Sequence, residues 1–90
     1  MDTGLVEVTI EYYGYFKTKT RNDFEKLKVP LNLKKGIEDI KRYLHLSYGI
    51  HEGYITLINN ESLTRVINKN HKTELFKNDV IKIIPVASGG

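Results

Sequence analysis

The apolar residues of this chain recur with two different periods, and this change of period is what most constrains the fold. From Val6 to Tyr12, apolar side chains alternate with polar ones, which is the pattern of a strand with one buried face. From Ile37 to Tyr48, apolar residues recur at helical spacing, which predicts one amphipathic helix. The sequence therefore predicts an α+β fold in which a sheet packs on a single main helix.

Further apolar stretches place the remaining strands. The predicted strands after the first are residues 27–33, 54–58 and 80–84, with 63–67 pairing back on 54–58 as a shorter strand. Pro30 has no amide donor, so the second strand should lie at an edge of the sheet. Pro85 is expected to end the last strand and to help release the chain from the sheet.

Glycine and asparagine mark the expected ends and turns. Gly36 is predicted to open the helix and Gly49 to stop it, because a left-handed cap favours a residue without a Cβ atom. Asn59-Asn60 and Asn78-Asp79 are predicted turns, since these side chains tolerate left-handed backbone angles. Gly14 and residues 17–23 are expected to form a connection, and Leu75 and Phe76 are expected to be buried.

Length and composition limit the function classes. The 90 residues can bury one core only, and the absence of cysteine excludes disulfides, thiolate metal ligands and a thiol nucleophile on the chain itself. No apolar run approaches the roughly 20 residues that cross a bilayer, and the start of the chain lacks the regions of a signal peptide, so no membrane partner and a cytoplasmic location are expected. A net charge of +3 does not indicate a nucleic-acid partner.

Few side chains form a pattern typical of a catalytic or metal site. His45, His51 and His71 lack metal-ligand spacing, so no metal site is predicted. The sequence contains no phosphate-binding glycine loop and no nucleophile elbow, so we do not expect the domain to be an enzyme by itself. The aromatic and basic residues from Tyr12 to Arg21 could stack on RNA, but a strand end that packs partly in the core and partly on a protein partner is the preferred interpretation.

The end of the sequence resembles a known family. The string from Val80 to Gly90 is a hydrophobic strand, one proline and a Val-Ala-Ser-Gly-Gly ending, and Val8–Gly14 and Ile37–Ile40 resemble the first strand and the helix start of the same family. With the predicted order of elements, these segments resemble the sulfur carriers of the MoaD/ThiS family, which includes the small subunit of molybdopterin synthase. The resemblance implies a ubiquitin-like β-grasp fold, a mixed sheet of four to five strands on one main helix, spanning residues 1–85, with a flexible tail at 86–90.

The resemblance also implies a chemistry for the tail. In that family, a ubiquitin-activating-type adenylating enzyme uses ATP to adenylate the terminal glycine, here Gly90, which a sulfur donor such as a cysteine desulfurase helps convert to a thiocarboxylate. No bound cofactor is implied. Gly89 and Gly90 suit passage through a narrow channel because they have no Cβ atom. Five extended residues reach roughly 16 Å, and Pro85, Val86, Ala87 and Ser88 are expected to contact the partner proteins.

Three functions remain open from the sequence. The leading one is sulfur donation for molybdopterin synthesis, with the large subunit of molybdopterin synthase receiving the tail. The second is a ubiquitin-like protein modifier, or a sulfur carrier for transfer-RNA thiolation or thiamine synthesis, using the same Gly90. The third is a non-covalent β-grasp interaction domain that binds RNA through the Tyr12 to Arg21 region, in which case Gly89-Gly90 would be an end without function.

Overall fold

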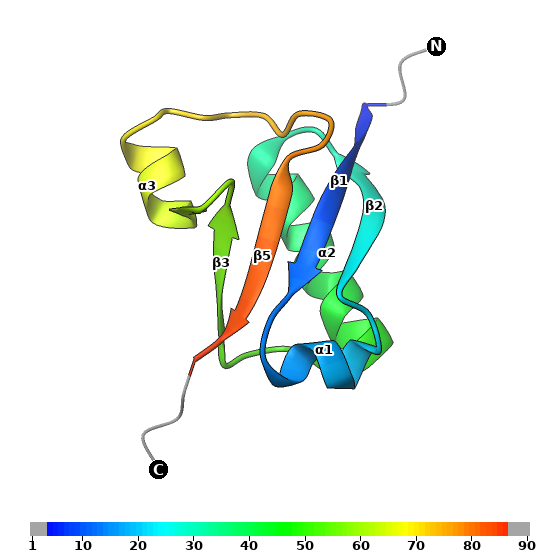
Figure 1. Ribbon diagram of the computed structural model, residues 1–90. Helices are drawn as coiled ribbons and strands as arrows, with labels where there is room; N and C mark the ends of the chain where they lie inside the picture. The colour runs from blue at the N-terminus through cyan, green and yellow to red at the C-terminus, as the bar shows by residue number, and fades with distance from the viewer. Residues whose placement is uncertain (1–3, 87–90) are drawn as a thin grey trace.

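The computed structural model describes residues 4–86, and they form one mixed sheet with a long helix across one face and short helices at its margins (Figure 1). The elements in chain order are β1 (Leu5–Tyr12), α1 (Tyr15–Thr20), β2 (Phe24–Pro30), α2 (Leu33–Tyr48), β3 (Tyr54–Ile58), β4 (Glu61–Ser62), α3 (Leu63–Asn68) and β5 (Val80–Pro85). None of the helices in this described range is long and apolar enough to cross a membrane.

The sheet has five strands in the order β2-β1-β5-β3-β4. β1 pairs with β2 as an antiparallel hairpin, β5 runs parallel to β1, and β3 is antiparallel to β5. This mixed sheet over one long helix confirms the predicted α+β class, and β2 lies at the edge of the sheet, as Pro30 predicts.

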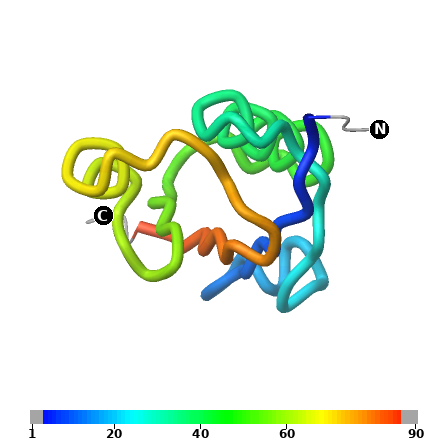
Figure 2. The backbone as a smooth tube through the Cα atoms, turned by 90° about the horizontal axis from the view of Figure 1, so that it is seen from above, coloured from blue at the N-terminus to red at the C-terminus, as the bar shows by residue number. Residues whose placement is uncertain are grey.

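The core fills the space between the sheet and α2. One face of the central strands contributes Val8, Ile10, Ile81 and Ile83, which are all completely buried. Ile40 and Leu44 of α2 pack against them and are at most 1% exposed. In the view from above, α2 covers one face of the sheet, while the other face has no helix over its centre (Figure 2). The predicted core faces of the helix and of the last strand are therefore confirmed.

The main helix is one turn longer than the sequence predicts. It begins at Leu33 rather than at Ile37, because the Asn32 side chain accepts a hydrogen bond from the Lys35 amide at 3.0 Å and caps the helix. Leu33 therefore belongs to α2, and the second strand covers 24–30 instead of 27–33. Gly49 ends the helix with φ of 70°, as predicted, and its amide bonds to the His45 carbonyl.

Gly36 has a different role from the predicted cap. It lies inside α2, where a Cβ atom would come within 2.6 Å of the Pro30 carbonyl oxygen and 2.5 Å of a Leu75 methyl group. The glycine thus allows α2 to approach the end of β2 closely. Leu75, which is 2% exposed, fills the same junction and confirms its predicted burial.

The hairpin connection is a short helix and not the predicted irregular segment. Phe16 and Thr20 lie one turn apart in α1, and both are buried. The Thr20 hydroxyl donates to the Phe16 carbonyl at 2.8 Å, so even the polar member of this pair is satisfied in the core. Three polar residues lie between them and Thr20 is itself polar, so the apolar pattern of the sequence does not reveal this helix.

Residues 63–67 form helix α3 instead of the predicted strand. The Ser62 hydroxyl accepts a hydrogen bond from the Arg65 amide at 3.2 Å, so the backbone turns into a capped helix after the two-residue strand β4. Asn59 and Asn60 form the predicted left-handed turn, with φ of 49° and 72°. Phe76, predicted to be buried, is 60% exposed, and its ring lies 4.1 Å from the Lys72 ammonium group.

Candidate functional site

The predicted tail begins where β5 leaves the sheet. Gly90, Gly89, Ser88 and Ala87 lie outside the residues that the structure describes, so the predictions for them remain untested. Pro85 is the last residue of β5 and lies opposite Tyr54 of β3. The structure therefore places the base of the tail at the end of a central strand, between the end of β1 and the start of β3 (Figure 1).

Hydrogen bonding to the sheet continues one residue beyond Pro85. The Val86 amide donates to the Gly53 carbonyl at 2.9 Å, although Pro85 was expected to end the strand. In the antiparallel pairing with β3, Pro85 occupies the position whose N–H would point away from β3, so its missing donor leaves that pairing intact. The proline ring instead packs at Gly14, where a Cβ atom would lie 2.7 Å from Pro85 Cγ.

Apolar side chains surround the base of the tail on the open face of the sheet. Successive side chains of a strand point to opposite faces, and Ile83 is fully buried in the core. Ile84 and Lys82 therefore face away from the core. Ile84 pairs with Ile55, which is 49% exposed, and Val86 is 52% exposed. Leu57 follows on the same face of β3, opposite Lys82. We call Ile55, Leu57, Ile84 and Val86 the outer-face patch.

Sequence reasoning did not single out this patch, although a signal for it was present. In residues 80–84 every position except Lys82 is apolar, so both faces of the last strand are apolar although only one packs on the helix. A contiguous exposed apolar group of this kind marks a surface that contacts another molecule. Lys82 borders the patch, and its ammonium group lies 5.5 Å from the Tyr13 ring.

The aromatic region after β1 is divided between the core and the surface. Tyr12 and Phe16 are each 1% exposed, so their rings are closed to a nucleic-acid base, whereas Tyr15 is 60% exposed. This division confirms the predicted core packing of part of the segment. Phe16 meets Tyr54 edge to face at 6.2 Å, which ties α1 to β3 beneath the base of the tail.

A carboxylate beneath this region gathers three tyrosine hydroxyls. Tyr12 and Tyr48 donate to Glu25 Oε2 at 2.5 and 2.7 Å, and Tyr43 donates to Oε1 at 2.7 Å. Burial opposes ionisation of Glu25, but these three donors outweigh it and lower the pKa of the carboxyl group. Burial, with the adjacent carboxylate, raises the pKa of Tyr12 and Tyr43. The cluster links β1, β2 and the end of α2, and its hydroxyl and carboxylate groups are paired with one another.

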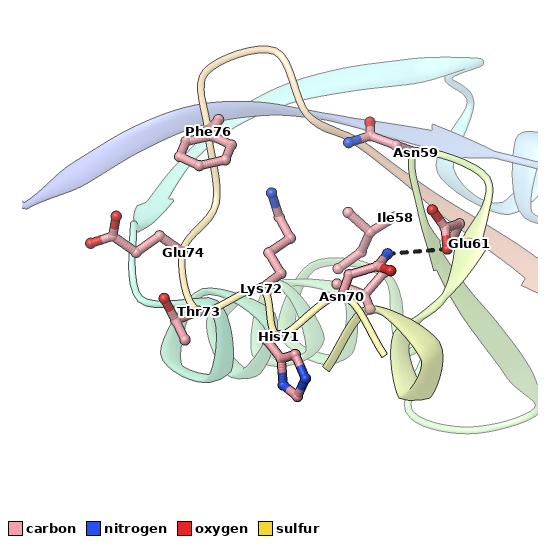
Figure 3. A pocket seen from close by; sticks show the side chains of 10 residues that line it. Ile58, Asn59, Glu61, Asn70, His71, Lys72, Thr73, Glu74 and Phe76 are labelled. Atoms are coloured by element: carbon pink, nitrogen blue, oxygen red, sulfur yellow. Dashed lines mark hydrogen bonds between the residues drawn. The ribbon is translucent and has the colours of Figure 1, made fainter. Parts of the chain in front are cut away.

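A cavity of about 460 Å³ lies between α3, the β3–β4 turn and residues 70–76 (Figure 3). Four of the polar side chains that line it, those of Asn59, Glu61, Asn70 and Lys72, bind one another or Asp79. Asn70 donates to Glu61 at 3.1 Å, and the Lys72 ammonium group lies 3.2 Å from Asp79. Burial opposes ionisation of Asp79, but donation by Asn59, the Phe76 amide and Lys72 lowers its pKa. These bonds fasten the long loop to the sheet.

Two of the three histidines lie close together in the structure. The rings of His45 and His51 lie 5.3 Å apart at the end of α2, while His71 lines the cavity near α3. Within residues 4–86, no three His, Asp or Glu side chains form a group able to hold a metal ion. At the base of the tail, the described residues offer the apolar side chains of the outer-face patch.

Comparison with known proteins agrees with this architecture. No family model matches the sequence, and no curated protein matches it significantly. Several solved structures are similar, including the following three. The Haloferax volcanii HVO 2177 protein has a TM-score of 0.69 and 17% identity, over 100% of this chain and 92% of that one. A putative molybdopterin converting factor, subunit 1, from Pyrococcus furiosus has a TM-score of 0.62 and 19% identity, over 91% and 99%.

The third structure is the small archaeal modifier protein 1 from Methanosarcina acetivorans. Its TM-score is 0.66 and its identity 18%, over 96% of this chain and 98% of that one. At these identities the likeness establishes a shared fold. The chain therefore has the ubiquitin-like β-grasp fold, in common with a molybdopterin converting factor subunit and a small archaeal modifier.

Proposed function

We propose that this chain is a sulfur carrier whose working group is the carboxylate of Gly90. The observation that carries the proposal is the position of the Val-Ala-Ser-Gly-Gly ending, which follows a central strand and starts beside the outer-face patch. The body of the domain would dock through that patch while the tail enters a partner's active site.

The chemistry needs two steps. A carboxylate oxygen of Gly90 attacks the α-phosphorus of ATP in an adenylating enzyme, and pyrophosphate leaves. Sulfide then attacks the acyl carbon, and AMP leaves with the bonding electrons. Where a cysteine desulfurase is the donor, its sulfur arrives as a persulfide, and a thiol reductant must supply the two electrons that bring it to the level of sulfide. The product is a thiocarboxylate on Gly90, which serves as the sulfur source for a later acceptor.

Molybdopterin synthesis is the proposed destination of the sulfur. The fold shared with the Pyrococcus converting factor subunit supports this choice. The large subunit of a molybdopterin synthase would receive the tail, and the adenylating enzyme would recharge it after each transfer.

Modification of other proteins is the second candidate. It is favoured by the fold shared with the archaeal modifier, and it would use the same activated Gly90. A lysine amine of a target would then attack the acyl carbon of the adenylate, AMP would leave with the bonding electrons and the nitrogen would lose a proton, giving an isopeptide bond in place of a thiocarboxylate.

Intact-mass measurement tests the proposal. The purified chain is incubated with the adenylating enzyme, ATP and sulfide, and we expect the mass change of one oxygen replaced by one sulfur. A chain that lacks Gly90 should keep the circular-dichroism spectrum and unfolding midpoint of the parent but gain no sulfur. No mass change in the parent would contradict the proposal, and Gly-Gly remnants on cellular lysines without thiocarboxylate would favour the modifier.

A further inference from the structure

The edge of the sheet farthest from β4 is open. β2 bonds to β1 on one side, and no other element of the described range 4–86 lies beyond it (Figures 1 and 2). Two hydrogen bonds lie at the ends of the β1–β2 pairing and fix its pattern: the Tyr12 amide donates to the Asp23 carbonyl, and the Leu31 amide donates to the Gly4 carbonyl. The residues of β2 that exchange bonds with β1 are therefore the odd-numbered ones.

The even-numbered residues of β2 face outward. Phe24, Lys26 and Lys28 direct their backbone N–H and C=O groups away from β1, and none of them bonds to another described residue on that side. Pro30 closes this row at one end, because it has no N–H and its carbonyl lies against Gly36 of α2. Five residues of strand, 24–28, thus remain available for pairing.

The side chains on this edge carry one sign of charge. Lys26 and Lys28 are exposed on the open face of the sheet, opposite Thr9 and Glu7 of β1. Neither lysine forms an ion pair within the described residues. Phe24, at the start of the row, is 58% exposed.

The positive charge of Lys26 and Lys28 determines which kind of strand can pair with the open edge of β2. Two copies of β2 paired antiparallel about Leu27 would place Lys26 of each copy opposite Lys28 of the other, and like charges that face each other destabilise a strand pair. Lysines on an edge strand are accordingly a common device against self-association. A strand with carboxylates at the facing positions would instead form opposite-charge pairs, so the same lysines favour it.

We propose that the open edge of β2 is a docking site for an extended acidic segment of a partner protein, which adds to the sheet as a sixth strand. The backbone groups of Phe24, Lys26 and Lys28 supply the hydrogen bonds, and the two ammonium groups select acidic residues at alternate positions. β1 separates this edge from β5, so the partner can hold the domain while the tail is used elsewhere.

Two blocked synthetic peptides serve as probes, Val-Glu-Val-Glu-Val and its lysine counterpart Val-Lys-Val-Lys-Val. Titrations followed by amide chemical shifts and hydrogen exchange should show binding of the glutamate peptide alone, with the Phe24, Lys26 and Lys28 amides gaining protection. Reversing both charges, Lys26→Glu with Lys28→Glu, should weaken binding of the glutamate peptide by about tenfold or more and allow the lysine peptide to bind.

A matched control reverses two other exposed lysines, Lys41→Glu with Lys69→Glu, which changes the net charge equally. Both lie on the α3 side of the molecule, at the end of the strand order opposite to β2. This variant should bind the glutamate peptide within about twofold of the parent, since salt screens charges that are far from the bound peptide. Equal losses in the two double variants would overturn the proposal. So would protection confined to the outer-face patch, self-association through β2, or binding of a single-stranded RNA oligomer to Lys26 and Lys28 with no binding of the peptide.

Discussion

Replacement of Gly36 by alanine sets two known effects against each other. Gly36 is in the interior of α2, where alanine is favoured over glycine by about 1 kcal/mol of helix propensity. The new Cβ atom, however, would lie 2.6 Å from the Pro30 carbonyl oxygen and 2.5 Å from Leu75 Cδ1. Optimal non-bonded separations are about 3.5 to 4.0 Å, so α2 would have to move away from β2 by about 1 Å.

The steric cost of the new Cβ atom should exceed the gain in helix propensity. Overpacking of a close-packed core costs about 1 to 3 kcal/mol, and the upper end applies here because one of the two obstacles is backbone. Subtracting the propensity gain of about 1 kcal/mol leaves a net loss of about 2 kcal/mol in the free energy of unfolding. Urea denaturation followed by circular dichroism measures this loss. Ser47→Ala, at an exposed position of the same helix, should instead leave stability unchanged or slightly higher. A Gly36→Ala variant as stable as the parent would refute the close-packing argument.

The remaining predictions concern the partly buried carboxylate of Glu25 and the two faces of β5. Glu25→Gln should lower the free energy of unfolding by about 1 to 3 kcal/mol, because one amide oxygen cannot replace the carboxylate as the acceptor for three tyrosines. Because folding lowers the pKa of Glu25, its carboxylate stabilises the folded state fully above the pKa that Glu25 has in the unfolded chain, and this stabilisation is lost as the pH falls through its pKa in the folded chain. The unfolding midpoints of parent and variant should therefore converge in acid. Midpoints that differ by the same amount at every pH would count against this. Ile83→Ala should cost about 2 to 5 kcal/mol, whereas Ile84→Ala on the open face should cost less than about 1 kcal/mol and slow sulfur loading; equal stability losses would show that the faces are assigned wrongly.

Periodicity in the sequence was enough to predict the sheet and its main helix, because Val8, Ile10 and Ile40 follow periods that burial imposes. Short helices were missed for a physical reason. In α1 and α3 only a single turn of each helix is buried, through Phe16 and Val66, and one turn gives too few apolar repeats to establish a period. Helix α1 begins after Gly14, which has a positive φ, and α3 begins at the cap formed by the Ser62 side chain. Glycine and serine are also common in turns, so neither residue predicts a helix by itself.

The candidate site was predictable in part. Pro85 and Val86 were named from the resemblance, but the bond from the Val86 amide to Gly53 depends on which pairing position Pro85 occupies, and that is set by the register of β3 with β5. The same register brings Ile55 beside Ile84. Contacts between strands far apart in sequence are not encoded in the spacing of either strand, so the outer-face patch required the structure.

The bond at Val86 also limits how the proposed carrier can work. With Val86 held to Gly53, four residues, 87–90, remain beyond it, and four extended residues span at most roughly 13 Å. The partner's active site must therefore lie within that distance of the end of β5. A protein surface that comes so close necessarily covers the nearest apolar side chains, which are the exposed Val86 and Ile55 and the half-buried Ile84. The apolar character of the patch then follows from the short reach of the tail, because each partner that uses Gly90 must contact the same few residues before it can act on the carboxylate.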